Sequence, residues 1–193
     1  GDADMVSLMD DRERMTSFSD LLELLVSAAT AVLQLHELGY IHCDIKPENF
    51  VIANDRAVAT LVDTDGIVDT RDPGSELFRV QFANSSATPE YMAPEWLYLK
   101  PLTAQGRTVG AFRETVAHMQ LEDGGAHGAL CKIDVYSFGC MIHTLVVAGG
   151  LVAKSQADHD IYFGLLTLAS NLTVSATAVM ELSSGDHDLR RRA

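Results

Sequence analysis

An aspartate, a lysine and an asparagine stand in the segment 42–49, which reads His-Cys-Asp-Ile-Lys-Pro-Glu-Asn. Lys46 follows Asp44 by two positions and Asn49 follows it by five, directly before the apolar run 50–52. Phosphoryl transfer needs a carboxylate to orient an attacking hydroxyl and accept its proton. It also needs a cation near the moving phosphoryl group and a side-chain oxygen to hold Mg²⁺. The spacing therefore predicts a catalytic loop for phosphoryl transfer.

The elements that must position this loop can be predicted on both of its sides. Upstream, the segment Phe18 to Leu38 carries apolar residues at helical spacing, and this pattern stops at Gly39, so it predicts one long helix. Downstream, the runs 50–52 and 57–62 are typical of short strands, and they are followed by Asp-Thr-Asp-Gly at 63–66. The loop thus stands between a helix and a β-rich turn.

Three later segments appear in an order that makes the whole chain resemble the eukaryotic protein kinase superfamily. Residues 87–95 are close to the G-T-x-x-Y-x-A-P-E pattern of that family, with Ala87 in place of glycine. Residues 132–139 resemble the start of the central helix of the large kinase lobe, and 186–190 resemble the late D-P-x-x-R element, with His187 in place of proline. An ordered set of motifs is far more specific than a single one.

The resemblance implies a mainly α fold: the large, C-terminal lobe of a protein kinase, with a small β-hairpin over 50–63 at the catalytic loop. It covers 1–193 as a partial kinase domain, with catalytic loop 42–49, metal motif 63–66, activation segment 63–95 and an insertion at 97–131. The glycine-rich loop and strand lysine of the small lobe are absent from this sequence. We therefore expect the 193 residues alone to transfer phosphate very weakly or not at all.

The same resemblance assigns the active-site residues of an enzyme that uses ATP and Mg²⁺ to phosphorylate serine and threonine hydroxyls of protein substrates. Asp44 is the expected base and Lys46 the charge stabiliser, while Asn49 and Asp63 are the expected metal ligands. Thr88, together with Lys46, matches serine/threonine-directed members. The residues implied at the nucleotide are Lys46, Glu48, Asn49, Val51 and Asp63.

Four further residues have structural roles by resemblance. His42 is expected in the apolar spine of the lobe, and Asp134 is expected to be buried and to accept hydrogen bonds from catalytic-loop amides. Glu95 is expected to pair with Arg190, since a buried charge needs a partner. Cys43 replaces the arginine that commonly reads a phosphate on the activation segment, so an arginine–phosphate pair is not expected to organise this site.

The metal motif departs from the D-F-G pattern of the family. Thr64 stands where a phenylalanine packs beneath the small lobe, and Asp65 stands where a glycine permits unusual backbone angles. Both changes favour an alternative: a pseudokinase or truncated kinase lobe that acts as a protein-binding, regulatory module. The intact set of Asp44, Lys46 and Asn49 favours the enzyme.

Residues 61–68 also support a different chemistry. Leu-Val-Asp-Thr-Asp-Gly-Ile-Val is similar to the first motif of haloacid-dehalogenase-type phosphatases, in which an aspartate after a strand is the nucleophile. That reading explains one segment, whereas the kinase reading explains five. A calcium-binding loop is weaker still, because Ile67 interrupts the ligand pattern.

Composition sets further limits. A net charge of −13 argues against binding a nucleic-acid backbone, and three cysteines form neither a paired framework nor a metal spacing. We find no run of about 18 apolar residues that would span a membrane and no secretory signal, so a cytoplasmic protein is the default expectation. The departures also resemble divergent secreted parasite kinases of the rhoptry group, but no residue fixes that subgroup.

Two regions outside the motifs carry expectations of their own. The insertion 97–131 is longer than the corresponding interval of compact kinases. It is expected to be either a solvent-exposed loop or a docking surface for a partner beside the substrate groove. Near the C-terminus, the pattern predicts one helix around 160–170 and another around 175–182. Hydroxyls at Thr70, Ser75, Ser85 and Ser86 are candidate phosphorylation sites.

Overall fold

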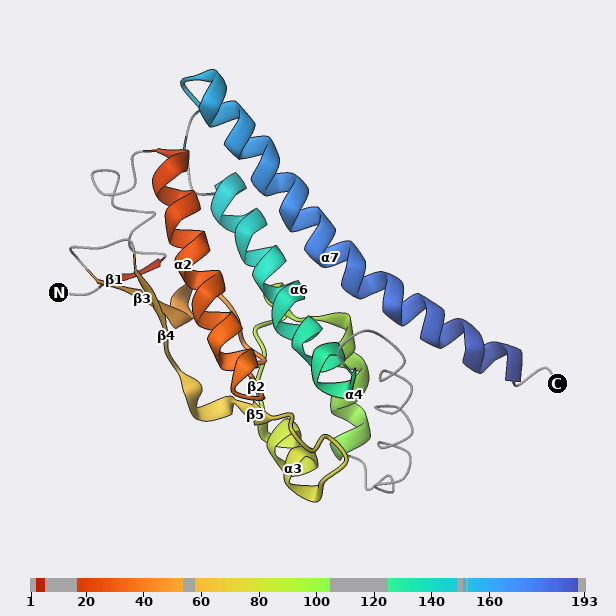
Figure 1. Cartoon of the computed structure of the whole chain (residues 1–193). Coiled ribbons are helices and arrows are strands. Elements are labelled where there is room, and N and C mark those ends of the chain that lie inside the picture. The colour runs from red at the N-terminus through yellow and green to blue at the C-terminus, as the bar shows by residue number, and fades with distance from the viewer. Residues whose placement is uncertain are drawn as a thin grey trace.

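The computed structural model describes residues 3–5, 17–53, 58–104, 125–148, 151 and 153–190. Three helices dominate it: α2 (Phe18–Glu37), α6 (Gly125–Ala148) and α7 (Gln156–Arg190). Figure 1 shows α2 and α6 side by side, with α7 running past α6 to the C-terminus. Their facing apolar side chains form the larger of two cores, which includes Phe18, Leu21, Leu25, Met141, Leu145 and Leu165.

Helix α2 begins and ends as its sequence predicts. Ser17 caps its N-terminus: the Ser17 hydroxyl accepts a hydrogen bond from the Asp20 N–H, and the Asp20 carboxylate accepts one from the Ser17 N–H. At the other end, Gly39 has a φ of 86°, a left-handed conformation that costs glycine nothing. The predicted helix over 18–38 is confirmed to within one residue, and it delivers the chain to the catalytic loop.

The C-terminal region differs from the prediction of two helices. Residues 156–190 form one continuous helix, α7. The prediction placed a break near 171–174, where threonine and valine have only slightly lower helix propensity, and no proline interrupts the segment. Gly139 of α6 lets α7 approach closely, because a Cβ at that position would lie 2.9 Å from Leu172 Cβ.

Short strands form two small antiparallel sheets. Strand β3 (Phe50–Ile52) pairs with β4 (Ala59–Leu61), with Val51 opposite Thr60. A further strand, β1 (Ala3–Asp4), pairs with the other edge of β3, so this sheet has three strands where the sequence predicted two. The second sheet joins β2 (Tyr40–Ile41) to β5 (Val68–Asp69). Residues 54–57, which would close the predicted hairpin, lie outside the described residues.

A second core is formed where the β2–β5 sheet and the segment that follows it pack against α6. That segment contains α3 (Glu76–Asn84), the 3₁₀ turn η3 (Pro89–Tyr91) and α4 (Pro94–Ala104), while two earlier 3₁₀ turns, η1 (Pro47–Asn49) and η2 (Thr64–Gly66), precede β3 and β5. The buried side chains of this core include Ile41, Val68, Phe78, Phe82, Trp96, Leu99, Leu130 and Ile133. This core joins the predicted activation segment to α6.

The predicted insertion at 97–131 is helical at both ends, where α4 reaches Ala104 and α6 begins at Gly125. Its middle, 105–124, lies outside the described residues, so the expected docking surface stays a prediction.

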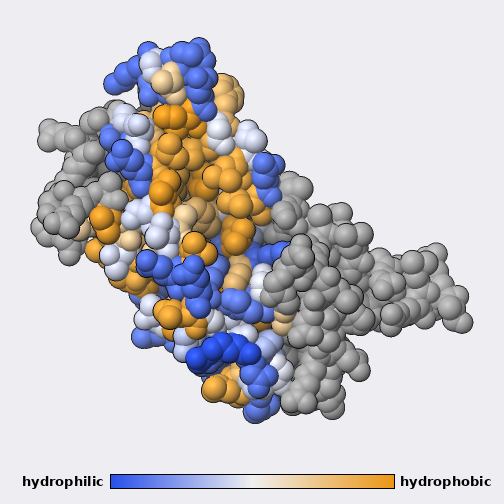
Figure 2. All heavy atoms as spheres, viewed as in Figure 1, coloured by the Kyte–Doolittle hydropathy of each residue, from blue (hydrophilic) through white to orange (hydrophobic). Residues whose placement is uncertain are grey.

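Two helices are long and apolar enough to cross a membrane by length and composition: Phe18–Glu37 and Ala126–Val147, with mean hydropathies of 1.5 and 1.4. No membrane span was predicted from the sequence, because no uninterrupted run of about 18 apolar residues occurs in it. Within the described structure, 61% of the second window is buried, as in the core helix of a protein outside the membrane. Figure 2 shows apolar side chains gathered over α2 and α6, and α2 exposes Leu22, Val26 and Leu33.

Candidate active site

The predicted catalytic loop, 42–49, is held by a buried carboxylate of α6. Asp134 of α6 is 0% exposed; its two oxygens accept hydrogen bonds from the backbone N–H groups of His42 and Cys43, each at 2.8 Å. Nε2 of His36, in the last turn of α2, lies 2.9 Å from Asp134 Oδ2. Cys43 has a φ of 69°, in the left-handed region, which costs a non-glycine residue energy. The Asp134 hydrogen bonds help to hold this strained turn, which sets the direction of Asp44.

Three predicted site residues meet in one cluster. The N–H and the hydroxyl of Thr88 both donate to Asp44 Oδ1, at 2.8 Å and 2.7 Å. Lys46 Nζ lies 2.8 Å from Asp44 Oδ2 and donates to Thr88 Oγ1 at 2.8 Å. The catalytic loop and the activation segment are therefore joined at the carboxylate that the sequence singled out.

This cluster fixes the charges of its members. Burial alone would raise the pKa of Asp44, but the hydrogen bonds from Lys46 and Thr88 outweigh it, so the pKa lies below the ordinary value for aspartate. The hydrogen bond to Asp44 raises the pKa of Lys46 above its ordinary value, although burial opposes this. At neutral pH the site thus holds an anionic carboxylate beside an ammonium group. An aspartate of low pKa suits a base that mainly orients a hydroxyl.

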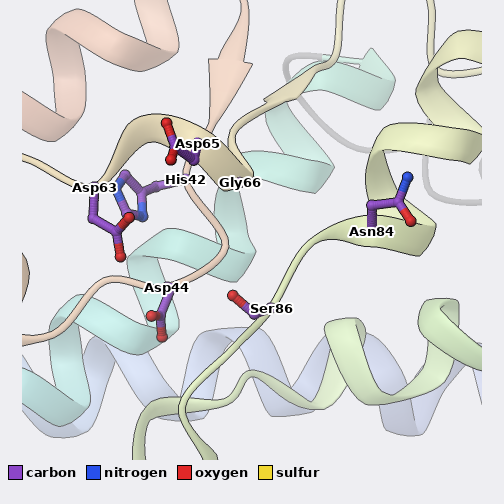
Figure 3. Close-up of a pocket in the computed structure, with 7 residues that line it drawn as sticks. All are labelled: His42, Asp44, Asp63, Asp65, Gly66, Asn84 and Ser86. Atoms are coloured by element: carbon purple, nitrogen blue, oxygen red, sulfur yellow. The ribbon is translucent and has the colours of Figure 1, made fainter.

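A pocket of about 220 Å³ opens beside this cluster. Its lining residues are His42, Asp44, Asp63, Asp65, Gly66, Asn84 and Ser86. Figure 3 shows the Asp63 carboxylate pointing toward the Asp44 side of the pocket and the Asp65 carboxylate pointing to the opposite side. The pocket thus combines catalytic-loop and activation-segment residues around a carboxylate-rich wall.

Asn49 and Asp63, the predicted metal ligands, both carry side-chain oxygen atoms of the kind that Mg²⁺ takes. Asn49 is 5% exposed, and its amide nitrogen donates to the Asp44 carbonyl oxygen at 2.7 Å, which turns its Oδ1 away from that carbonyl as the oxygen for a cation. Asp63 lies exposed at the pocket with a φ of 60°. Among the described residues no three acidic, histidine or cysteine side chains gather as a metal cage. Mg²⁺ commonly takes one or two protein carboxylates and completes its shell with water and phosphate oxygens.

The departures in the metal motif are visible in this geometry. Thr64, Asp65 and Gly66 form the 3₁₀ turn η2, in which no residue is buried. Thr64 therefore makes no buried contact here of the kind that the family's phenylalanine makes. Because the Asp65 side chain points away from Asp44 in Figure 3, the extra carboxylate does not converge with the other two.

The remaining predicted residues lie around this centre. His42 is 2% exposed and its Nε2 lies 3.0 Å from the Val62 carbonyl oxygen, so its ring is packed beneath the loop. Glu48 is exposed, and Val51 is partly buried on β3. Neither lines the pocket.

Of the predicted pair Glu95 and Arg190, the structure describes the side chain of Glu95 only. Glu95 is 2% exposed, and neither of its carboxylate oxygens has a hydrogen-bond partner in the part of the chain that the structure describes. Burial raises its pKa to about 7. The side chain of Arg190, at the end of α7, lies outside the described residues, so the pair stays a prediction.

The structure adds residues that sequence reasoning missed. His36 supports Asp134, and its signal was a histidine in the last turn of a helix that feeds the loop. Two candidate phosphorylation sites are interior: Thr70 is 1% exposed and Ser85 is 5% exposed. The Thr70 hydroxyl bonds the Gly39 carbonyl oxygen at 2.8 Å and lies 2.6 Å from His127 Nδ1. These two hydroxyls therefore lie in the interior of the structure and not at its surface.

Comparisons with known proteins show the family of this chain. The family model described as "Protein kinase domain" matches residues 3–183. A serine/threonine-protein kinase H1 homolog of Danio rerio is 38% identical over 85 residues, which cover 44% of this chain and 19% of that protein. Serine/threonine-protein kinase PknD of Protochlamydia amoebophila is 27% identical over 145 residues, which cover 72% of this chain and 12% of its own length. The chain spans a fifth or less of these relatives, and by its match over most of its length it belongs to the protein kinase family.

Proposed function

We propose that this chain is the large lobe of a serine/threonine protein kinase and carries its catalytic loop. The observation that supports this best is the three-way contact of Asp44, Lys46 and Thr88. It places a carboxylate, a cation and an activation-segment hydroxyl at one point. The predicted helix, loop and strands surround that point in the order that a kinase requires.

Each residue has a role that follows from its contacts. Asp44 accepts the hydrogen bond of an incoming serine or threonine hydroxyl and orients its oxygen, while Lys46 offsets negative charge beside it. Thr88 fixes the Asp44 carboxylate through its N–H and hydroxyl. The segment after α3 thereby becomes part of the substrate platform. Lys46 and Thr88 together match the serine/threonine-directed class.

ATP and Mg²⁺ are the cofactors that this site fits. ATP supplies the phosphoryl group, and Mg²⁺ neutralises charge on the phosphates. Asn49 and Asp63 would hold the metal, since the Asn49 amide is oriented by Asp44 and Asp63 reaches the pocket wall. Lys46 stands where it can meet the transferred group. Its pKa is raised first by Asp44 and, more weakly, by the charges of Glu48 and Asp63.

The test is phosphoryl transfer by the protein as its own cells make it. Asp44→Asn keeps the shape of the side chain but removes the base, and we expect the turnover number to fall about 100-fold or more. Asp72→Asn, an exposed aspartate of the activation segment, is the matched control and should keep full turnover. Transfer of labelled phosphate to serine and threonine peptides is the measurement. Equal turnover numbers for the Asp44→Asn protein and the wild type would contradict the proposed function.

A second candidate, a binding module without catalysis, is favoured by the exposed turn at Thr64 and Asp65. It predicts that the wild-type protein binds a partner, or binds Mg²⁺ and ATP, and transfers no phosphate. Calorimetric titration with ATP and Mg²⁺, run beside the transfer assay, separates the two candidates. Binding together with transfer that depends on Asp44 selects the enzyme, and binding without transfer selects the module.

A further inference from the structure

A lysine of helix α4 reaches into the end of helix α3. The amine of Lys100 donates hydrogen bonds to the carbonyl oxygens of Phe82, at 3.0 Å, and Ser85. The same ammonium lies 4.8 Å from the centroid of the Trp96 ring, within the range of a cation–π contact. Lys100 is partly buried, and this burial lowers its pKa. The lysine is therefore built into the second core.

The carbonyl groups that Lys100 binds lie at the C-terminal end of α3, and that of Phe82 also accepts a hydrogen bond from the Ser85 N–H at 3.3 Å. Phe82 stands in the last turn of α3 and Ser85 is its C-cap, where the helix dipole also favours a cation. The Ser85 hydroxyl donates to the Phe82 carbonyl oxygen at 2.8 Å, and the Trp96 indole N–H donates to Ser85 Oγ at 3.3 Å. Helix α4 thus grips the end of α3 with two side chains.

This contact at Ser85 lies three residues before Thr88, which hydrogen-bonds the Asp44 carboxylate. Thr88, which donates twice to Asp44, follows Ser85 with Ser86 and Ala87 between them. Such a short span leaves little freedom between the two anchored ends, so fixing Ser85 limits where Thr88 can lie. Lys100 acts on the site through this segment and does not itself line the pocket.

Because residue 43 is a cysteine, the predicted catalytic loop brings no positive charge from this position to the activation segment. The resemblance places Cys43 where the family commonly has an arginine that holds the activation segment. Here Cys43 is 2% exposed, and burial raises its pKa well above the ordinary value, so the thiol is uncharged. The Ser85 side chain acts on the same thiol and opposes this rise in its pKa. Cys43 therefore meets the activation segment as a neutral group, and Lys100 of α4 brings a positive charge to that segment.

We propose that Lys100 is a positioning residue that holds the activation segment through the carbonyl oxygens of Phe82 and Ser85, so that Thr88 reaches Asp44 without a phosphate on that segment. The proposal rests on the proposed kinase function for its effect on turnover. The grip itself can be measured without catalysis.

The experiment compares Lys100→Met, Lys100→Arg and wild type in the protein as its cells make it, with Lys154→Met, an exposed lysine before α7, as the control. Hydrogen exchange reports on the amides of residues 85–88. Steady-state kinetics report kcat and KM for ATP, with and without prior phosphatase treatment. We expect Lys100→Met to lose amide protection and to lower kcat about 10- to 100-fold with KM for ATP unchanged. Lys100→Arg and Lys154→Met should behave as wild type, and phosphatase should leave wild-type turnover unchanged.

The outcomes separate the two proposals. Wild-type protection and kcat in Lys100→Met would overturn the role of Lys100 while leaving the kinase function standing. Loss of wild-type turnover on phosphatase treatment would overturn it too, whether or not the methionine variant folds. A wild type that transfers no phosphate, but whose amides lose protection in Lys100→Met, would end the proposed function and keep the grip.

Discussion

At the scale of single residues, Glu95 lies in an environment that is unusual for a carboxylate. Its carboxylate is buried without a hydrogen-bond partner among the described residues, and burial raises its pKa from 4.5 to about 7. The folded state therefore binds a proton at Glu95 more tightly than the unfolded state does. This contribution to stability is fully present below about pH 4.5 and is lost as the pH rises through about 7.

We therefore predict that Glu95→Gln removes part of the pH dependence of stability. Between pH 5 and pH 8, the unfolding free energy of the wild type should fall relative to that of the variant, by on the order of 1 to 3 kcal/mol. Urea denaturation at four pH values measures this difference, with the exposed Glu90→Gln as the control. A Glu95 paired with Arg190 would have a lowered pKa instead. The wild type would then gain stability relative to the variant on going from pH 3 to pH 5, and that result would contradict the prediction.

The residues that sequence could predict are those whose spacing along the chain encodes their chemistry. Asp44 and Lys46 stand in one short loop, and Thr88 belongs to a recognisable motif. His36 and Lys100 were missed because their partners, Asp134 and Phe82, are distant in sequence, and nothing in one sequence states which side chains fold together. The same limit applies to Ser85, which looked like a surface hydroxyl and is interior.

At the scale of elements, helix α2 positions the catalytic loop, and its N-terminal cap is a separable part of its stability. The hydrogen bonds between Ser17 and Asp20 satisfy two backbone N–H groups of the first turn. We predict that Ser17→Ala lowers the unfolding free energy by about 1 kcal/mol. Ser17→Asp should retain most of it, because an aspartate also caps.

Urea denaturation of Ser17→Ala beside Ser19→Ala tests the cap, since Ser19 is exposed two residues further on and no cap is lost there. Hydrogen exchange in the first turn should rise in Ser17→Ala alone. Equal stability of the two alanine variants would show that the cap contributes nothing.

Elements were predictable where local signals agreed and unpredictable where tertiary contacts decided. Helix α2 combines an apolar stripe, a cap and a terminal glycine, so its bounds followed from sequence. Strand β1 has two residues and exists only as a partner of β3, which no local pattern indicates. The prediction divided the segment of α7 into two helices because of weak propensity differences of a few tenths of a kcal/mol per residue. Packing of α7 on α6 outweighs these differences.

At the scale of the whole molecule, the larger and smaller cores meet at Asp134. This residue lies on α6, which contributes side chains to both cores, and it binds the end of α2 through His36. Its two oxygens also fix the amides of His42 and Cys43 in the catalytic loop. Folding of the bundle and formation of the site are therefore coupled through one carboxylate.

We predict that Asp134→Asn weakens both the stability of the helical bundle and the geometry of the predicted catalytic loop. The amide keeps one acceptor oxygen but turns an NH₂ group toward a backbone N–H, so one of the two loop amides is left buried and unpaired. The unfolding free energy should fall by about 2 to 4 kcal/mol, and the amides of His42 and Cys43 should exchange faster than the remainder of α6. Asp160→Asn, at an exposed position of α7, is the control and should change neither. If Asp134→Asn lost stability with unchanged exchange at His42 and Cys43, the carboxylate would support the bundle alone, and the loop would owe its geometry to the Thr88 contacts with Asp44.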